Sequence, residues 1–414
     1  MVSTPQTIAC IMLLLPCMTY ADSEVIQPLS LQAALTISLQ HNLSLAQQQA
    51  RAEAMDSIPS QVASLPDPII HFNALNLPIN SFNLAQENMT QLQGGVSQNL
   101  PFFGKLALKE KSALHQAEAA HYQLGEFRLQ LQRDVQQIWW RIFYLQRALE
   151  IIALNQNLLR QFINIARTKY EVGEGLQQDV LLAQLERSKL LDRQLSLQGL
   201  LKKSHARLNN LLARPANQHV SLPAQIAETL VTLKSESILY KLAKNSRALL
   251  HAQHKSIDSA QSRLALAQKS LLPDFKLGVF YGGRSDSLSG QQRADLMSIK
   301  LSMNLPLFAV TKQQKSIDQQ HSELQQQRYH LQAQWLQVQM DISNAYSDFQ
   351  QSKQQSILFK QGIIPQARQT VASMLAGYQV NKVDFLNLVR SQITLYNYEI
   401  QYWQAFTKAK QAKA

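Results

Sequence analysis

Few side chains in this sequence are spaced for chemistry, and the pair His251 and His254 comes nearest to a site. The two lie three positions apart, a spacing at which imidazoles on one helix face could share a metal ion. No further ligand type stands beside them, so the pair equally fits a solvated helix face. The glycine pairs at 94–95 and 282–283 lack the spacing of a phosphate loop. With no nucleophile–base set or carboxylate pair recognisable, the sequence predicts no enzyme, no cofactor and no resident metal.

A long helical stretch over residues 105–170 is the element around which the rest is arranged. Proline does not interrupt it, and its apolar residues recur at alternating steps of four and three. This heptad spacing keeps one stripe facing a partner helix. The stripe consists of Leu131, Val135, Ile138, Ile142, Leu145, Leu149 and Ile152. At ~1.5 Å per residue the stretch would form a rod of about 100 Å, and so narrow a stripe requires that the rod lie against other rods.

The N-terminal residues read as an export signal. An apolar stretch too short to span a bilayer is followed by small residues just before Asp22, so residues 1–21 are expected to be a signal peptide. Both cysteines, Cys10 and Cys17, lie in this leader. Cys17 leaves a lipoprotein anchor as an alternative, although Pro16 stands where a small residue is expected. Cleavage would leave a mature chain without thiols, as in many envelope proteins.

The charge of the chain indicates solvated helix faces. Forty lysines and arginines against 28 acidic residues give a net charge of +12, but the basic residues are spread out and not interleaved with aromatics. Nucleic acid is therefore not expected as a partner. After the leader no run of about 18 apolar residues occurs, so strands would have to carry any membrane role.

The chain repeats one order of elements. The first copy reads as a helix over 29–62, strands over 69–77 and 89–100, the long helix, and a return helix over 179–212. The second reads as a helix over 238–269, strands over 275–281 and 296–305, a long helix reaching 378, and a return helix reaching 406.

Three landmarks fix the spacing between the copies. The Leu-Pro-Asp at 65–67 recurs 207 positions later, the Asn-Leu-Pro at 99–101 recurs after 205, and Tyr170 matches Tyr378 after 208. The chain therefore reads as a tandem duplication. We expect a first repeat over 22–212, a linker or equatorial segment over 213–237 and a second repeat over 238–414.

The last predicted strand alternates most clearly. One face carries Met297, Ile299, Leu301, Met303 and Leu305, and the other carries Ser298, Lys300, Ser302 and Asn304. Such alternation is typical of a membrane barrel strand with lipid outside and water in the lumen, although a half-buried strand of a soluble sheet gives the same pattern. Four strands cannot close a barrel, and open edges cannot lie in hydrocarbon, so several copies would have to share one barrel. Three copies would supply twelve strands and leave a lumen.

Four short motifs mark the two copies: Leu-Pro-Asp-Pro at 65–68, Gln-Asn-Leu-Pro-Phe-Phe-Gly-Lys at 98–105, Tyr-Glu-Val-Gly at 170–173 and Tyr-Gln-Val at 378–380. Together with the order of elements, which occurs twice, they resemble the TolC-type outer membrane efflux factors across essentially the whole mature chain. The resemblance implies a mostly α-helical homotrimer: a 12-stranded β-barrel in outer membrane lipid, four strands per chain, continued into the periplasm by a coiled-coil α-helical barrel. It also implies a periplasmic adaptor and an inner-membrane pump as partners, with this chain as a passive exit duct. The Pro-Asp-Pro at 66–68 looks like the branch that serves heavy-metal pumps.

The resemblance places a periplasmic gate at the two hairpin tips. Its candidate residues here are Tyr170, Gly173 and Asp179 in the first hairpin and Tyr378, Asp384, Asn387 and Arg390 in the second. The family's acidic pair falls on Asn387 and Arg390, so the sequence departs from an acidic ring. We expect residues 382–390 to line the entrance. Asp179 and Asp384 could instead act only as helix N-caps.

Two other classes of protein fit parts of the pattern. A periplasmic adaptor also contains an α-hairpin, but it would show one hairpin flanked by β modules where this chain shows the same unit twice. A soluble coiled-coil scaffold with a small sheet would be distinguished by its recovery outside the membrane fraction.

Overall fold

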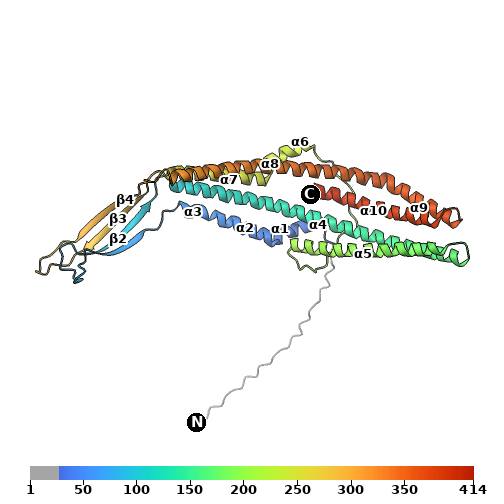
Figure 1. The fold of residues 1–414 in the computed structure, drawn as a ribbon, viewed down its shortest axis with the longest axis horizontal. Coiled ribbons are helices and arrows are strands. Elements are labelled where there is room, and N and C mark those ends of the chain that lie inside the picture. Colours follow the sequence, from blue (N-terminus) through green and yellow to red (C-terminus); the bar gives the residue numbers. More distant parts are fainter. Residues whose placement is uncertain (1–27) are drawn as a thin grey trace, which may run out of the picture.

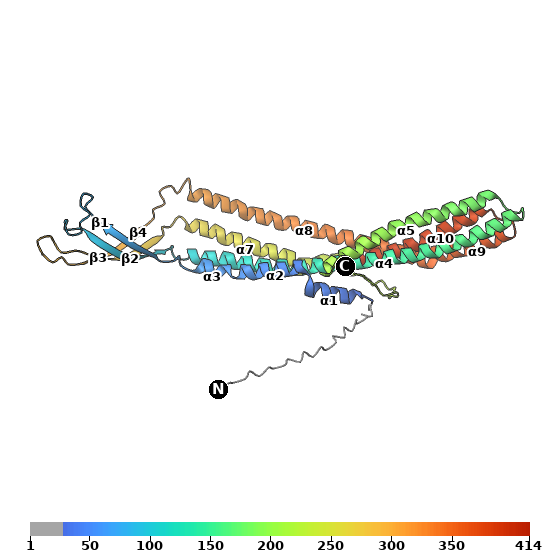
Figure 2. The ribbon, with the colours of Figure 1, turned by 90° about the horizontal axis from the view of Figure 1, so that it is seen from below.

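The computed structural model describes residues 28–414, so the predicted signal peptide and both cysteines lie outside the described part. The molecule is long and thin: a β-sheet forms one end, two helical hairpins form the other, and long helices run between them (Figures 1 and 2). The two hairpin tips therefore lie at the far end of the molecule from the sheet.

The first helical segment is divided where the sequence predicted one helix. It forms α1 (Leu31–His41), α2 (Leu43–Asp56) and α3 (Ile58–Ala63). At Asn42 the backbone is extended, and the side-chain carbonyl accepts a hydrogen bond from the Leu45 N–H at 2.9 Å. The Asn42 amide also donates to the Leu211 carbonyl at 3.0 Å. Asn42 thus caps α2 and ties it to a helix end 169 positions away.

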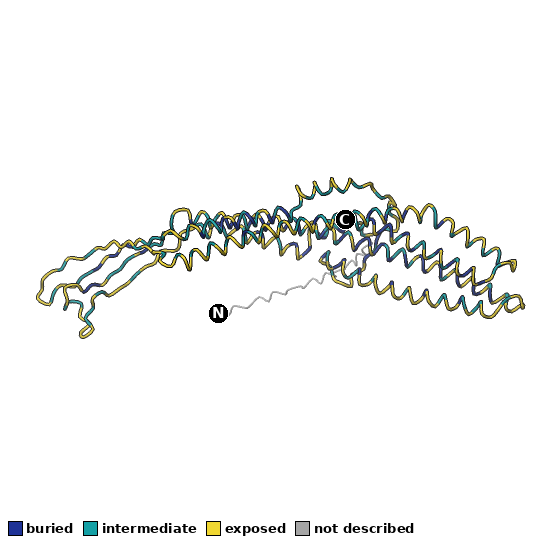
Figure 3. The backbone as a smooth tube through the Cα atoms, turned by 45° about the horizontal axis from the view of Figure 1, so that its top comes forward, coloured by how far each residue is buried: buried dark blue, intermediate teal, exposed yellow. Residues whose placement is uncertain are grey.

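The long helix α4 (Lys105–Glu171) runs for 67 residues without a break. Six of its seven heptad residues are buried, and Leu149 is half-buried. Its partners come from the same chain, among them α5 (Gln177–Leu211), which returns beside it from the first tip (Figure 1). Buried positions follow the helices through the middle of the molecule, whereas the sheet and the tips are largely exposed (Figure 3).

Aromatic side chains fill the core where the two repeats meet. Trp139, Trp140 and Phe143 of α4 pack with Phe406, and the Trp139 indole donates to the Leu29 carbonyl at 3.0 Å. The tryptophans therefore pack between helices.

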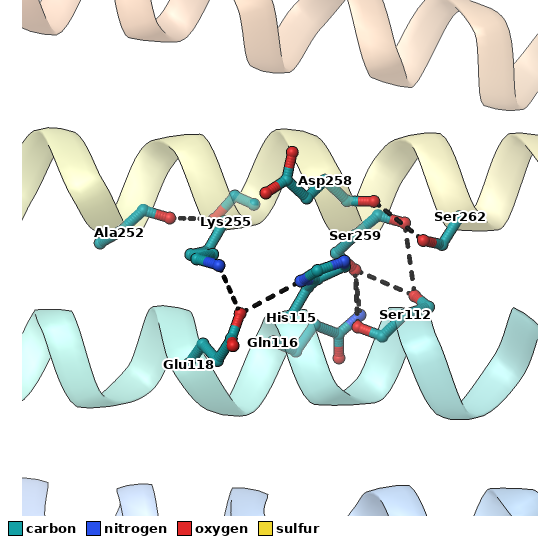
Figure 4. A network of polar contacts seen from close by, with 10 residues as sticks. Ser112, His115, Gln116, Glu118, Ala252, Lys255, Asp258, Ser259 and Ser262 are labelled. Carbon is teal, nitrogen blue, oxygen red and sulfur yellow. Dashed lines mark hydrogen bonds and ion pairs between the residues drawn. The ribbon is translucent and has the colours of Figure 1, made fainter.

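A polar strip joins α4 to α7 (Ala248–Lys269) (Figure 4). Ser112 and Ser259 are both buried and share a hydrogen bond of 2.9 Å between their hydroxyls. Farther along, Lys255 pairs with Glu118 at 2.8 Å, and the hydrogen bond from Lys255 is the main reason that the pKa of Glu118 is lowered. Small hydroxyls allow the two helices to approach closely while Ser112 and Ser259 satisfy each other.

The second repeat is also divided. It forms α6 (Glu236–Ser246), α7, α8 (Gln313–Leu358), the π-helical turn η1 (Phe359–Ile363), α9 (Ile364–Gln379) and α10 (Phe385–Lys413). The predicted helix over 238–269 breaks at Arg247, 205 positions after the break at Asn42. Here the Arg247 guanidinium binds the buried Glu126 carboxylate at 2.7 and 3.0 Å. The long helix predicted to reach Tyr378 is interrupted by η1, because Pro365, the second residue of α9, supplies no N–H for a regular turn.

The segment over 213–237 lacks regular structure up to Ser235 but is anchored to the helices. The Glu228 carboxylate accepts hydrogen bonds from the Lys360 ammonium and the Tyr402 hydroxyl, both at 2.6 Å. Burial raises the pKa of Glu228, but these two bonds outweigh it and hold the pKa below its ordinary value. Burial and the same bond to Glu228 raise the pKa of Tyr402.

The sheet is antiparallel with the order β1-β2-β3-β4. Its strands are β1 (Ile69–Leu75), β2 (Gln91–Leu100), β3 (Phe275–Gly283) and β4 (Leu296–Met303), within two residues of the predicted bounds at every strand end. The register aligns one apolar residue from each strand across the sheet: Ile70, Val96, Val279 and Ile299. All four are exposed, so this face of the sheet is apolar and uncovered apart from Gln98, which pairs with Leu277.

The other face is polar at its centre, where Phe280 lies across it, and carries Ile69, Leu75 and Leu296 at the strand ends. The ring covers Gly95 and Gly278, and a Cβ added at Gly95 would stand 2.2 Å from Phe280 Cδ1. His71 packs beside this ring and hydrogen bonds to Ser97 at 2.7 Å. The weak alternation of residues 94–95 therefore has a steric reason: Gly95 makes room for an aromatic ring.

Candidate functional site: the hairpin tips and the polar face of the sheet

The two hairpin tips have the same backbone design. Gly173 after α4 has a φ of +79° and Asn381 after α9 has a φ of +60°. The following N–H groups, of Glu174 and Lys382, reach back five residues to helix carbonyls at 2.8 Å in both tips. Left-handed residues just past a helix commonly close its last turn in this way, and asparagine tolerates the conformation better than most residues.

The matching tyrosines of the two tips differ in environment. Tyr170 is 48% exposed, whereas Tyr378 is 5% exposed and packs against Phe385 with the ring centroids 5.1 Å apart. The Tyr378 hydroxyl is buried and has no hydrogen-bond partner within residues 28–414. Burial, and then the charge of Asp179, raise the pKa of Tyr378. Tyr378 thus belongs to the core of the tips, and Tyr170 to their surface.

The two predicted aspartates come from different hairpins and lie close enough to influence each other. Burial raises the pKa of Asp179, and the nearby charge of Asp384 raises it further. Asp384 occupies the N-cap position of α10 but makes no side-chain capping bond. Asp179 is the third residue of α5, whose N-cap is Leu176. The N-cap alternative therefore matches the position of Asp384 alone and does not explain Asp179.

The remaining second-hairpin candidates lie along the start of α10. Asn387 and Arg390 are exposed at three-residue steps from Asp384, which places all three on one helix face. Leu388 and Val389 on the other side of the helix are buried. The tip therefore presents an acidic, an amide and a basic side chain to its surroundings.

Lys169 is a tip residue that the sequence analysis did not single out. Its ammonium donates to the carbonyl of Tyr378 at 3.0 Å and to the carbonyl of Gln379 at 3.4 Å, and it also bonds to the Asn381 side chain. It lies 4.9 Å from the centre of the Tyr378 ring. We call this set of contacts the tip bridge, because it joins the last turn of α4 to the C-terminal end of α9. The available signal was a basic residue in the last turn of a helix, which is common and not specific.

A buried polar pair lies behind the tips. The Gln392 amide of α10 donates to the Asn155 side chain of α4 at 2.6 Å, and both residues are buried among apolar neighbours. The pair fixes how the second hairpin docks on the first, since either residue alone would leave a buried polar group unsatisfied.

Three of the four predicted lumen residues lie on the polar face of β4: Ser298, Lys300 and Ser302. Asn304 lies past the end of the strand. Its N–H donates to the Asp274 carbonyl at 3.2 Å, and its side chain accepts a bond from the Asp274 N–H. Asn304 therefore closes the strand end, where sequence alternation alone had grouped it with the others.

The histidine pair does not form a site in the structure. The His251 ring stacks on Tyr122 and its Nε2 contacts the Asn245 carbonyl at 3.0 Å, while His254 is exposed. Within residues 28–414 no group of three or more His, Cys, Asp or Glu side chains lies close enough to hold a metal ion. In the same range, none of the helices is both long and apolar enough to cross a membrane.

A family model matches the C-terminal part of the chain, and solved structures share its fold. Residues 239–414 match the family model described as outer membrane efflux protein. No curated protein sequence matches the chain.

Several solved channels share the fold of the chain. The outer-membrane channel OprN superposes with a TM-score of 0.78 at 17% identity, covering 92% of this chain and 88% of its own. The outer membrane protein VceC of Vibrio cholerae superposes with a TM-score of 0.77 at 16% identity, covering 94% of this chain and 95% of its own. CusC, whose structures describe folding and transmembrane channel formation, superposes with a TM-score of 0.77 at 15% identity. The match covers 94% of this chain and 91% of CusC.

Proposed function

Because residues 239–414 match the family model of outer membrane efflux proteins and the chain shares the fold of solved channels, we propose that it is the passive exit duct of a tripartite efflux system. It is an outer membrane channel whose helical part extends into the periplasm. The duct needs no catalysis of its own, since an inner-membrane pump supplies the energy and a periplasmic adaptor joins the two. The sheet lies at the membrane end and the hairpin tips at the end that faces the pump.

The observation that carries the proposal is an apolar sheet face beside two open edges. β1 and β4 each pair on one side only within residues 28–414. In hydrocarbon, every unpaired backbone group on these edges would cost several kcal/mol. Pairing β1 of one copy with β4 of the next removes the edges. Three copies give a closed barrel of twelve strands with the exposed apolar face toward lipid and the polar face toward a lumen.

We assign the gate to the hairpin tips. Asp384, Asn387 and Arg390 face outward from α10, and Asp179 brings a second carboxylate beside Asp384. The tip bridge from Lys169 would hold the second hairpin against the first and keep the entrance narrow. Tyr170 and Gly173 form the outer turn of the first hairpin and would meet the adaptor. The mixture of charges differs from an acidic ring.

The division of the chain follows the duplication. We propose repeats over 22–212 and 238–414, joined by the segment over 213–237 around the middle of the molecule. The matched helix breaks at Asn42 and Arg247 support this division. Heavy-metal ions as cargo stay a prediction from the Pro-Asp-Pro motif, and the likeness to CusC concerns the fold alone.

Conductance and mass together test the duct. The protein would be purified in detergent, its native mass measured, and the same sample added to planar lipid bilayers. We expect a particle of three 46.8 kDa chains, less any leader removed, that forms stable pores. A folded monomer that remains in the aqueous phase and forms no pores would contradict the proposal and favour the soluble scaffold.

A further inference from the structure

The charged residues of the sheet are all of one sign. The four strands contain two lysines, Lys276 in β3 and Lys300 in β4, and no aspartate or glutamate. We propose that these lysines make the barrel lumen selective for anionic solutes. The inference rests on the proposed function, because a ring forms only when copies of this sheet close into one barrel.

Both lysines lie on the polar face and close to each other. Lys276 pairs in register with Ser302 on β4 and Asn99 on β2, whereas Lys300 pairs with Gly278. Lys276 and Gly278 are two residues apart, so the two lysines are diagonal neighbours on one face, about 7–8 Å apart at the backbone. Gly278 has no side chain of its own, and the Phe280 ring lies over it, so the residue opposite Lys300 supplies no polar or charged group. Each copy thus contributes a pair of ammonium groups at one level of the lumen.

Neither ammonium is neutralised within residues 28–414. Lys300 is exposed, Lys276 is half-buried, and neither forms an ion pair or hydrogen bond with a described residue. Two carboxylates at the ends of the strands, Asp274 and Asp295, already have partners, whereas Asp67, two residues before β1, is exposed and forms no ion pair with a described residue. Asp274 binds Lys105 at 2.8 Å, and Asp295 accepts bonds from the Arg284 N–H and the Tyr281 hydroxyl.

A ring of this kind acts on every ion that passes. Rings of lysine or arginine select for anions in pores, and lumen substitutions tune the selectivity of β-barrels. At physiological ionic strength a fixed charge acts over about 8 Å, so paired lysines on each sheet would reinforce one another. A free divalent cation would be repelled at this level. The barrel therefore favours anionic cargo, or metal carried as an anionic complex, over bare metal cations.

Reversal potentials across a salt gradient test the inference. The intact protein would be placed in planar bilayers with KCl at different concentrations on the two sides, and Lys276→Gln/Lys300→Gln would be compared with the unchanged chain. The matched control is Lys241→Gln/Lys244→Gln, which removes two exposed lysines from α6, outside the sheet. Lys276→Arg/Lys300→Arg keeps the charge and checks that the variants assemble.

We expect a reversal potential with the sign of chloride conduction for the unchanged protein, the control and the arginine variant. It should shift toward zero, or change sign, in the glutamine variant. Pores that select for potassium, or a glutamine variant with an unshifted potential, would overturn the inference and leave the duct intact. A folded protein that forms no pores in any variant would overturn the proposed function and the inference with it.

Discussion

Replacing Lys169 by methionine removes the tip bridge while keeping most of the apolar stem of the side chain. The lost ammonium donates to two carbonyls at the C-terminal end of α9 and to the Asn381 side chain. Because the bridge joins α4 to the second tip, its loss should free that tip to move outward. We therefore expect Lys169→Met to open the periplasmic entrance.

The size of the effect follows from the contacts of Lys169. A hydrogen bond that involves a charged group contributes about 1.5–3 kcal/mol, a cation at a helix C-terminus about 0.3–1, and an exposed cation–π contact about 0.5–1. These terms share one ammonium, and Lys169 is half-exposed, so water replaces part of what is lost. The closed tips should therefore lose about 1–3 kcal/mol of stabilising free energy, which raises the ratio of open to closed tips about 5–150-fold.

Single-channel recording measures this ratio. The open probability of Lys169→Met in planar bilayers would be compared with the unchanged protein. Lys189→Met is the matched control, because it removes the same charge from the same hairpin, where Lys189 pairs only with Glu186 on an exposed helix face. Exposed pairs of this kind contribute about 0–1 kcal/mol. An open probability that is unchanged in Lys169→Met, or raised equally in Lys189→Met, would refute the role of the tip bridge.

Three further predictions concern assembly and stability. Gly95→Val drives a side chain into the Phe280 ring above it. We expect the protein to lose about 1–3 kcal/mol of stability and to give less heat-resistant oligomer on gels. Asn155→Leu leaves the buried Gln392 amide unpaired, so stability should fall by about 1–3 kcal/mol in thermal unfolding. The Glu228 carboxylate, with its pKa held below the ordinary 4.5, adds stability at higher pH that is lost as pH falls through the folded-state pKa. Melting temperatures should fall less steeply with acid in Glu228→Gln.

Each of these predictions has an internal comparison. Gly94→Val should assemble normally, because nothing lies within 4 Å of an added Cβ there, and equal losses at both glycines would contradict the close contact. Asn155→Leu/Gln392→Leu should recover most of the stability, and no recovery would mean that the bond is not the cause. Parallel acid profiles for Glu228→Gln and the unchanged chain would show that the carboxylate does not anchor the segment over 213–237.

The fold was largely predictable because its signals are local and repeated. Heptad spacing marked α4, prolines at 66 and 68 marked the first helix end, and alternation marked β4. The helix breaks at Asn42 and Arg247 were not predictable in the same way. They depend on partners distant in sequence, Leu211 and Glu126, which no local pattern reveals.

The sequence predicted where the hairpin tips lie in the chain, but not which side chains contact one another there. The turns were found from repeated motifs, but the repeat gave no reason to expect Tyr378 buried and Tyr170 exposed. Lys169 reaches residues more than 200 positions away, so its role depends on how the hairpins dock. Asn304 continued the alternation of β4 yet turned out to bind the start of β3. In each case the role of the residue depends on tertiary packing, which the local sequence pattern does not reveal.

Disulfide cross-linking between sheet edges tests the shared barrel most directly. In a Cys10→Ser/Cys17→Ser background, cysteines would replace Phe72 on β1 and Ile299 on β4, with neighbouring positions scanned for register. Within one chain these edges are three strand spacings apart, about 14 Å, which exceeds the reach of a disulfide. We predict that oxidation of the membrane-embedded protein links one, two and three chains and stops there. Monomers alone at every register, or a ladder that continues past three chains, would contradict the account.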